Sequence, residues 1–572
     1  MEVAVVALVL GVAIAIVARV RGRFALIAAF LATTAGAFAM RPPPSPSPPP
    51  ERPKAPRAST YVGSAACRGC HPSEHASFSR TFHRTMTQDA TPQAVLARTG
   101  EKLDPEGHAL VVDRDGVVWA AGPGDAKRVV LATGSHREQA YWVAGGRPGE
   151  LSLFPFVWLV RERQWMARRD AFVTPPDRPL VDAHWNSSCI ACHAVAGEPG
   201  HERDDFDTRA AELGVACEAC HGPGAAHVAK HRDPVTRYVQ YTSKAPDPTI
   251  VHPKRLPAER SAAICGQCHS YAYPRDEDDW WAHGYARAFR AGDALEPSRI
   301  LLSPAVLASP RAPVLDTDAR SLFWDDGAIR VGGREYNGLV ESPCWQGEGE
   351  RKITCISCHA MHAGDPSGQI APDRTGDRAC TSCHATTPEH SHHAAGSPGA
   401  RCVACHMPKT SYALLSAVRS HRIETPHVDP AKPSACNLCH LDKSLAWTST
   451  ILGTWYRAKR TDDADDVPYA ARAAFAGDAA ERVIVADALG SAESRAASGE
   501  GWQPRILAEL VSDPYAAVRF VAARSLRAQP GFADLPAERA AVVARSARAI
   551  VEPATARSLL DTRDTRAVTI AE

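Results

Sequence analysis

The chain has 572 residues, with 65 Lys and Arg against 64 Asp and Glu, and a formal net charge of +1. This balance gives no long-range attraction for nucleic acid or for an acidic partner. Hydrophobic residues make up 45% of the chain, an ordinary share, and the length is enough for about two to four domains. Histidine is abundant, with 24 residues, and 17 residues are cysteine.

Two apolar runs, residues 2–18 and 24–40, open the chain and are separated by a short arginine-containing segment. Each run is close to the minimum length of a membrane-spanning helix. One interpretation is a helical hairpin whose arginine loop stays in the cytoplasm. The other makes the second run a secretion signal with Ala37-Phe38-Ala39 as its cleavage site. We favour a membrane anchor over a signal segment for residues 1–40. Both interpretations place the rest of the chain on the periplasmic side of a bacterial inner membrane, either anchored there or secreted.

Residues 41–57 are rich in proline and predict an extended, semi-rigid linker without a core. After this linker the pentapeptide Cys-x-x-Cys-His occurs for the first time, in the segment 58–94, and the chain contains eight copies of it. The copies leave only Cys344, which we expect to be a small buried residue. The motif cysteines are Cys67, Cys70, Cys189, Cys192, Cys217, Cys220, Cys265, Cys268, Cys355, Cys358, Cys380, Cys383, Cys402, Cys405, Cys436 and Cys439.

Each copy of the motif places two thiols and an imidazole on one face of a helical turn, because residues i, i+3 and i+4 are neighbours on a helix. Two thiols can form thioethers with the two vinyl groups of one haem, and the histidine is then its proximal iron ligand. Zinc sites and disulfides are alternatives, but neither requires a histidine directly after every second cysteine. We therefore predict eight covalently bound haem c groups, with proximal ligands His71, His193, His221, His269, His359, His384, His406 and His440.

The other histidines are available as sixth iron ligands. His83 follows the first motif on an apparent short helix, and His184 comes shortly before the second motif. His227 lies just past the tight turn at 222–224, which brings backbone close to the porphyrin, and His362 follows the fifth motif. The candidate distal ligands are His83, His184, His227, His362, His392, His393 and His421.

The segments between the motifs differ in character. Residues 95–175 alternate apolar and polar residues between Gly-containing turns, which predicts a small antiparallel β insert. Residues 445–572 have apolar residues at helical spacing and predict an all-α domain, with one stretch that resembles a HEAT-type repeat; a plain helical bundle is the alternative. The remaining segments are 176–290 with haems 2–4, 291–345 as a connecting hairpin region and 346–444 with haems 5–8. The predicted fold class is a multihaem cytochrome c, mostly α and irregular, with little regular structure in its haem core.

Several of these stretches resemble exported bacterial multihaem cytochromes c, namely YVGSAACRGCH, CEACHGPGAAH, ITCISCHAMH and SHHAAGSPGARCVACHMPKTSY. The wider superfamily includes the tetrahaem cytochrome of ammonia oxidisers, octahaem hydroxylamine oxidoreductase and ammonia-forming nitrite reductase. The resemblance implies distal ligands at His83, His227, His362, His392 or His393, and His421. Two departures matter. The Cys-x-x-Cys-Lys motif of the nitrite reductases is missing, and Tyr412, which invites comparison with the haem-linked tyrosine of hydroxylamine oxidoreductase, lies in an apolar run that is more typical of core.

We expect an electron carrier that passes electrons between respiratory partners, such as a quinol-linked donor, through stacked haems with mainly two histidine ligands. The alternative is a periplasmic oxidoreductase that acts on nitrite, hydroxylamine or tetrathionate at one haem with an open position. A third hypothesis is an assembly module that the C-terminal helical repeats dock to a partner. If one haem is open, we expect it among the first four, beside the β insert. No nucleic-acid partner is expected.

Overall fold

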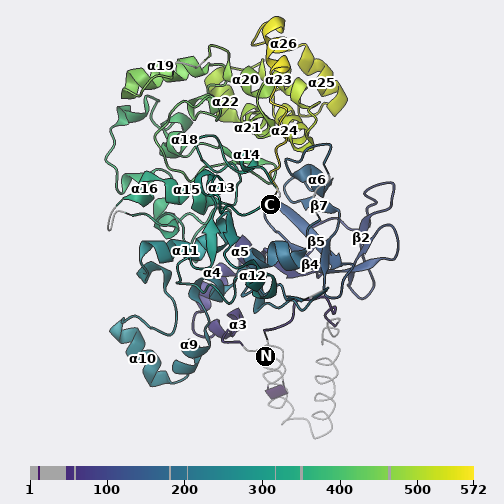
Figure 1. Ribbon diagram of the computed structural model, residues 1–572, viewed down its shortest axis with the longest axis vertical. Coiled ribbons are helices and arrows are strands. Elements are labelled where there is room, and N and C mark those ends of the chain that lie inside the picture. The colour runs from purple at the N-terminus through teal and green to yellow at the C-terminus, as the bar shows by residue number, and fades with distance from the viewer. Residues whose placement is uncertain are drawn as a thin grey trace, which may run out of the picture. The chain divides into compact units, whose positions relative to one another are not determined.

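The computed structural model describes residues 11–12, 47–56, 59–178, 182–202, 204–315, 317–347, 352–461 and 465–571. Residues 49–572 form one compact unit, which Figure 1 shows as a ribbon. The predicted membrane anchor or signal segment, residues 1–40, lies outside the described residues except for Gly11 and Val12. Within the described ranges, no helix is both long and apolar enough to cross a membrane.

Residues 49–56, at the end of the proline-rich segment, are part of the compact unit. The Arg52 amide donates to the Pro49 carbonyl in a turn, and Pro53 is buried. The Lys54 amide donates to the Thr208 carbonyl, and the Ala210 amide donates to the Lys54 carbonyl. Arg52 forms an ion pair with Asp89 on the first strand.

The predicted β insert is an eight-stranded antiparallel sheet with the path β2-β3-β4-β5-β7-β8, in which β1 pairs with β4 and β6 pairs with β5. A bulge interrupts the pairing of β4 with β5 between Val129 and Leu131. Apolar and β-branched residues recur along these strands, and this composition suits a sheet that is packed on both faces. The strands are β1 Thr87–Asp89, β2 Ala109–Val112, β3 Val118–Ala121, β4 Lys127–Thr133, β5 Glu138–Ala144, β6 Leu151–Leu153, β7 Phe156–Leu159 and β8 Gln164–Ala167.

The two faces of this sheet have different partners. One face forms a small core of its own, which includes Leu110, Val118 and Tyr141. The other face, with Leu131 and Trp142, packs against Trp185, just before the second motif, and Ile190, within it. The sheet therefore holds the second motif in place.

The region with the motifs has only short helices, single turns and two-stranded ribbons, as predicted for a fold whose interior is filled by a cofactor. Its helices are α3 Ser64–Cys67, α4 Pro72–Phe78, α5 Phe82–Thr85, α6 Arg168–Ala171, α7 Ile190–His193, α8 Cys217–His221, α9 Ala225–Lys230, α10 Pro234–Ser243, α11 Ala258–His269, α12 Glu277–His283, α13 Pro304–Leu307, α14 Ala319–Leu322, α15 Glu335–Glu341, α16 Pro343–Gln346, α17 Arg378–Thr381 and α18 Cys402–His406. The ribbons pair β9 Ala194–Val195 with β12 Glu212–Leu213, β10 His201–Glu202 with β11 Asp205–Phe206, β13 Ala272–Pro274 with β14 Arg299–Leu301, and β15 Ser411–Ala413 with β16 Ser416–Val418.

The connecting region contains less β structure than its turn residues predict. Phe323 and Ile329 form a single bridge around the Asp-Gly turn. After the Gly-Gly turn, the residues that were expected to pair instead form helix α15. Tertiary packing explains the difference, because the helix buries Tyr336 and Leu339 against Ala262 and Leu295.

The C-terminal region is helical, as predicted, and consists of α19 Leu445–Tyr456, α20 Tyr469–Phe475, α21 Ala479–Leu489, α22 Ala492–Ser498, α23 Gln503–Leu510, α24 Ala516–Arg527, α25 Ala537–Arg545 and α26 Pro553–Asp561. Its core is continuous with the rest of the unit, because Val157 of the sheet and Tyr412 of the seventh motif segment belong to the same buried cluster as Val483 and Leu507. Tyr412 is only 1% exposed, which confirms the prediction that it is a core residue.

Candidate functional site: a cavity lined by cysteine and histidine

The motifs form the helical turns that their spacing predicts. In the first motif the His71 amide donates to the Cys67 carbonyl over 2.9 Å, and in the eighth the His440 amide donates to the Cys436 carbonyl over 2.8 Å. Helices α7, α8, α11 and α18 end on the histidines of the second, third, fourth and seventh motifs. The two thiols and the imidazole of a motif thus lie on one face of one turn.

The motifs surround one cavity of about 4020 Å³. A pocket for one small molecule has a volume of roughly 300–1,000 Å³, so this cavity has room for several large cofactors. Both cysteines and the histidine of each of the first seven motifs line it, together with Cys436 of the eighth. All 17 cysteines are free, so none is committed to a disulfide. The thiol pairs, the imidazoles and the space between them fit covalently attached haem.

Six motif histidines lie opposite a second histidine. The ring centroids are 6.1–6.4 Å apart in every pair. A metal–imidazole bond is about 2.0 Å long and the ring centroid lies about 1.1 Å behind the nitrogen, so two rings on opposite sides of one metal have centroids about 6 Å apart. The pairs are His71 with His227, His221 with His362, His269 with His83, His359 with His421, His406 with His390, and His440 with His393.

Seven of these twelve histidines have a hydrogen-bond partner for Nδ1 in the protein, and this leaves Nε2 as their free nitrogen. His421 Nδ1 is buried without such a partner among the described residues. His221 Nδ1 is 2.8 Å from the Val251 carbonyl, and His406 Nδ1 is 2.9 Å from the Glu424 carbonyl. His83 Nδ1 is 2.5 Å from Gln369 Oε1. A metal-binding histidine usually donates its other ring N–H in this way, which sets its tautomer and orientation.

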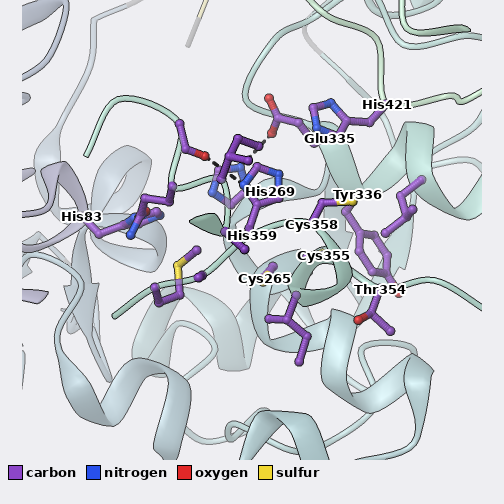
Figure 2. A pocket seen from close by; sticks show the side chains of 18 of the residues that line it. His83, Cys265, His269, Glu335, Tyr336, Thr354, Cys355, Cys358, His359 and His421 are labelled. Atoms are coloured by element: carbon purple, nitrogen blue, oxygen red, sulfur yellow. Dashed lines mark hydrogen bonds and ion pairs between the residues drawn. The ribbon is translucent and has the colours of Figure 1, made fainter. Parts of the chain in front are cut away.

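Two of the histidines have a carboxylate at this position. His269 Nδ1 lies 2.8 Å from Glu335 Oε2, and Figure 2 shows the pair beside His83, His359 and His421. Burial favours the neutral form of the Glu335 carboxyl, but its hydrogen bond with His269 holds its pKa well below the usual value. Burial disfavours charge on His269, and the hydrogen bond to Glu335 reverses this effect and raises the pKa of the imidazole. A charged hydrogen bond therefore orients one motif histidine.

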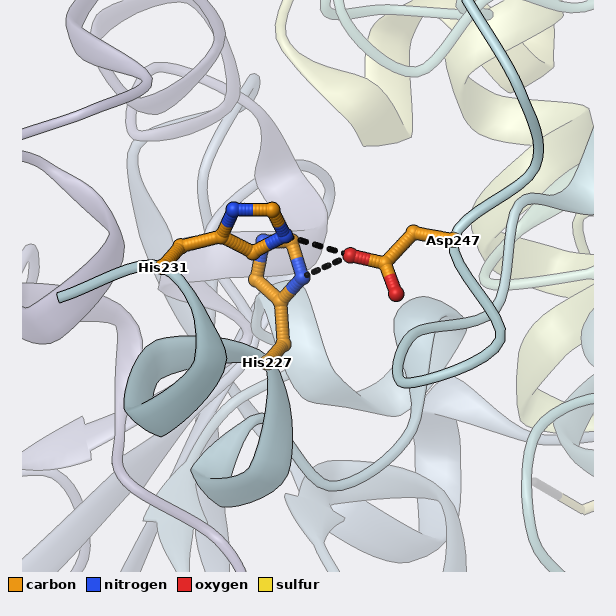
Figure 3. A group of neighbouring side chains, drawn as sticks. All are labelled: His227, His231 and Asp247. Carbon is orange, nitrogen blue, oxygen red and sulfur yellow. Dashed lines mark hydrogen bonds and ion pairs between the residues drawn. The ribbon is translucent and has the colours of Figure 1, made fainter. Parts of the chain in front are cut away.

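The second carboxylate belongs to Asp247. It lies 3.1 Å from His227 Nδ1 and 2.5 Å from His231 Nε2, and Figure 3 shows both rings directed at the same oxygen. Lys230 Nζ donates to the other oxygen over 3.1 Å. Because an ammonium group already occupies this carboxylate, the cluster is better suited to orienting His227 than to binding a separate cation.

Two candidate distal histidines lie elsewhere. The His184 ring is 3.1 Å from Glu150, and the His392 ring stacks on Trp455 with centroids 4.3 Å apart. His392 has a positive φ of 53°, which turns its side chain away from the direction of its neighbours. His390 lies opposite His406 instead, and nothing in the local sequence distinguishes it from the other histidines of the cluster.

Two motif histidines, His193 and His384, have no second histidine ring opposite them among the described residues. His384 is exposed. His193 lies next to strand β1 of the β insert, with Nδ1 3.5 Å from Thr87 Oγ1. Burial lowers the pKa of the His193 imidazole to about 4. On the loop between β4 and β5, His136 stacks on Phe82 with centroids 4.1 Å apart, and both residues line the cavity.

Cysteines of different motifs are in contact, and these contacts order the motifs in space. Cys192 and Cys268 approach each other so closely that each sulfur lies 3.9–4.0 Å from the carbonyl of the other residue. Hydrogen bonds between thiols join Cys67–Cys217, Cys192–Cys268, Cys265–Cys355 and Cys380–Cys402. Three further pairs of thiols are close enough to interact electrostatically, namely Cys220–Cys265, Cys358–Cys383 and Cys405–Cys436. The motifs therefore run in the order 1, 3, 4, 5, 6, 7, 8, with the second motif beside the fourth.

Comparison with known proteins gives matches on the motif segments. The family described as "Doubled CXXCH motif" matches residues 348–389, which contain the fifth and sixth motifs. The family described as "Cytochrome c554 and c-prime" matches residues 167–222, which contain the second and third. Among solved structures, the crystal structure of Outer Cell Wall Cytochrome OcwA is similar, with 17% identity and a TM-score of 0.47 over 84% of this chain and 100% of that one. No curated protein matches the sequence. The cavity, the motif turns and the two family matches identify the chain as a multihaem c-type cytochrome.

Proposed function

We propose that this protein is an electron carrier with eight covalently bound c-type haems, six of which are held between two histidines. The six facing histidine pairs support this proposal, because their spacing leaves room for one metal in each pair. Bound haem supplies reversible one-electron chemistry, and the protein binds, orients and insulates it. The motif cysteines anchor the eight groups, and the motif histidines are the proximal ligands.

The proposed distal ligands are contributed by segments near other motifs. His227, just after the third motif, faces the histidine of the first, and His362, just after the fifth, faces the histidine of the third. His83, after the first motif, faces the histidine of the fourth. The set of proposed distal ligands is His83, His227, His362, His390, His393 and His421. Because each of these distal histidines comes from a segment next to another motif, neighbouring haem sites are held close together. This closeness supports electron transfer from motif to motif in the order described above.

Two of the ligand histidines have a carboxylate at Nδ1, and this supports reduction potentials that differ from one haem site to the next. A negative partner on Nδ1 makes a histidine a stronger donor to iron and stabilises the oxidised state, whereas a carbonyl partner does this less. We therefore assign lower potentials to the sites with Glu335 and Asp247 than to the site whose histidine is bound to the Val251 carbonyl.

We also propose a location and partners for this carrier. The apolar runs 2–18 and 24–40 would anchor it at the periplasmic side of a bacterial inner membrane, with a quinol-linked or cytochrome donor. The helices of residues 445–572 would form HEAT-like pairs that dock a partner protein. Contacts between α21 and α24, and between α23 and α24, are compatible with such pairs.

The test combines the mass of the intact protein with near-infrared magnetic circular dichroism. We expect eight covalent haems per chain and six low-spin haems with the signature of two histidine ligands. Fewer than six such haems would contradict the proposed ligand pairs, and fewer than eight covalent haems would contradict the assignment of the motifs.

A second candidate function is oxidoreductase activity at the second motif. The supporting observation is that His193 faces no second histidine within the part of the chain that the structure describes, while Arg168, Arg299 and Arg334 interact electrostatically with the cysteines of this motif. Such cationic surroundings suit a small anion such as nitrite or tetrathionate. The test is to add nitrite, hydroxylamine or tetrathionate to the oxidised protein and record its spectrum. A high-spin signal that shifts on addition supports this function, and eight low-spin haems would exclude it.

A further inference from the structure

Helix α10, residues Pro234–Ser243, turns its apolar side outward. Local signals build the helix, because the Asp233 carboxylate caps its first turn, Pro234 occupies the first position and Lys244 ends it in a left-handed conformation. None of its residues is buried. Figure 1 shows it at the edge of the molecule, next to α9.

The outward side of α10 carries an apolar stripe. Val235, Tyr238 and Val239 are 68%, 70% and 56% exposed, and they follow the i, i+3, i+4 spacing of one helix face. The neighbouring face has a different role, since Arg237 and Tyr241 line the cavity with the motif residues. Because Val235, Tyr238 and Val239 are not part of the cavity lining, cofactor in the cavity leaves them uncovered.

Basic side chains surround this stripe. Residues 230–255 contain six Lys and Arg against two Asp, in a chain whose overall charge is +1. One of the two acids, Asp247, is already bound by Lys230 and two histidines. Five exposed basic residues form no ion pair with any described carboxylate: Arg232, Arg237, Lys244, Lys254 and Arg255. Arg232, Arg237 and Lys254 also line the cavity, whereas Lys244 and Arg255 do not. An apolar centre within a cationic rim is complementary to an acidic protein surface.

The stripe lies beside one end of the series of motifs. Helix α9 carries His227 opposite His71, and α10 follows it directly. The first motif is the terminal member of the spatial order described above. We propose that α10 is the docking surface for an acidic redox protein that exchanges electrons with the haem of the first motif. This proposal rests on the proposed electron-carrier function.

The size of the surface favours a transient redox complex over other occupants. A ten-residue helix is about 15 Å long, and weak electron-transfer encounters bury less than about 1,200 Å², whereas obligate dimers bury roughly 2,000 Å² or more. Helices that lie on membranes combine a basic face with Trp, Phe or Leu. The apolar residues of α10 are only Val and Tyr, so a protein partner fits better.

The experiment measures how fast an acidic donor reduces the haem-loaded full-length chain. Reduced plant-type ferredoxin is the probe, and stopped-flow absorbance follows the haems at several salt concentrations. The variant is Tyr238→Ser with Val239→Ser, and the matched control is Val542→Ser with Val543→Ser, an apolar pair on α25 that is 64% and 41% exposed. A second variant, Lys244→Gln with Arg255→Gln, tests the cationic rim with two residues that do not line the cavity.

We expect the second-order rate constant to fall about tenfold in the Tyr238/Val239 variant and to remain unchanged in the α25 control. The Lys244/Arg255 variant should lose most of the salt dependence of this rate. Dithionite, a small reductant, should reduce all four proteins at the same rate, which shows that the haems are intact.

Equal ferredoxin rates in the α10 and α25 variants would overturn the proposal. An unchanged ferredoxin rate together with loss of sedimentation on phosphatidylglycerol vesicles would overturn it in favour of a membrane surface. A dimer that the α10 variant converts to a monomer would overturn it in favour of a second copy. Failure of dithionite to reduce the wild-type protein would instead count against the electron-carrier function, and against this proposal with it.

Discussion

Replacing Glu335 with Gln should raise the potential of one haem. Gln has the same shape and keeps an oxygen 2.8 Å from His269 Nδ1, but it removes the negative charge. A hydrogen bond to a charged group contributes about 1.5–3 kcal/mol against about 0.5–1.5 for a neutral one. The difference between the two is about 1–1.5 kcal/mol. If the charged hydrogen bond stabilises only the oxidised haem, losing it raises the reduction potential by about 40–65 mV for a one-electron couple. The haem bound to His269 should therefore become easier to reduce by this amount.

The assay is a potentiometric titration followed by visible absorption and by electron paramagnetic resonance. Glu341→Gln is the matched control, because Glu341 is on the same helix and its Oε2 contacts Arg422 rather than a motif histidine. We expect one component of the Glu335→Gln titration to move to higher potential, with the haem content unchanged. A curve that superimposes on those of wild type and Glu341→Gln would refute the argument that this carboxylate tunes a haem.

Three further predictions concern ligation and stability. His393→Ala should convert one haem from low-spin to high-spin in the magnetic circular dichroism spectrum, whereas His392→Ala should convert none; the opposite result would reverse the assignment within this histidine cluster. Asp513→Asn should lower the free energy of unfolding by about 3–5 kcal/mol in chemical denaturation, because it leaves the Arg482 guanidinium, 2% exposed and 2.6 Å from Asp513, without its charge partner; a loss below 1 kcal/mol would contradict this. Burial raises the pKa of Glu481 to about 7, so the folded state holds this proton more tightly than the unfolded state, and the resulting stability is present at low pH and lost as pH rises from about 4.5 through 7. Glu481→Gln should remove this decline in a series of thermal melts, and an unchanged pH dependence would refute it.

The sequence by itself determined the features that depend on local spacing. Two thiols and an imidazole meet on one helical turn whatever the rest of the chain does, so the attachment motifs and their turns could be predicted. Period-two alternation predicted the β insert, and helical spacing predicted the C-terminal helices, because each pattern reflects which side of an element is buried. The Asp-Gly and Gly-Gly turns were less informative, since burial of Tyr336 and Leu339 turned the expected second strand into a helix.

Only the tertiary structure decided which histidines face each other. His227 lies six residues past His221 in the sequence but opposite His71, and His362 lies three residues past His359 but opposite His221. Within 390–393, backbone direction rather than residue type separates His390 and His393 from His392, which turns onto Trp455. The order of the motifs follows in the same way, because it depends on contacts between thiols far apart in the sequence. Local sequence spacing therefore predicts where a haem is attached, and long-range packing determines which histidine lies opposite the motif histidine.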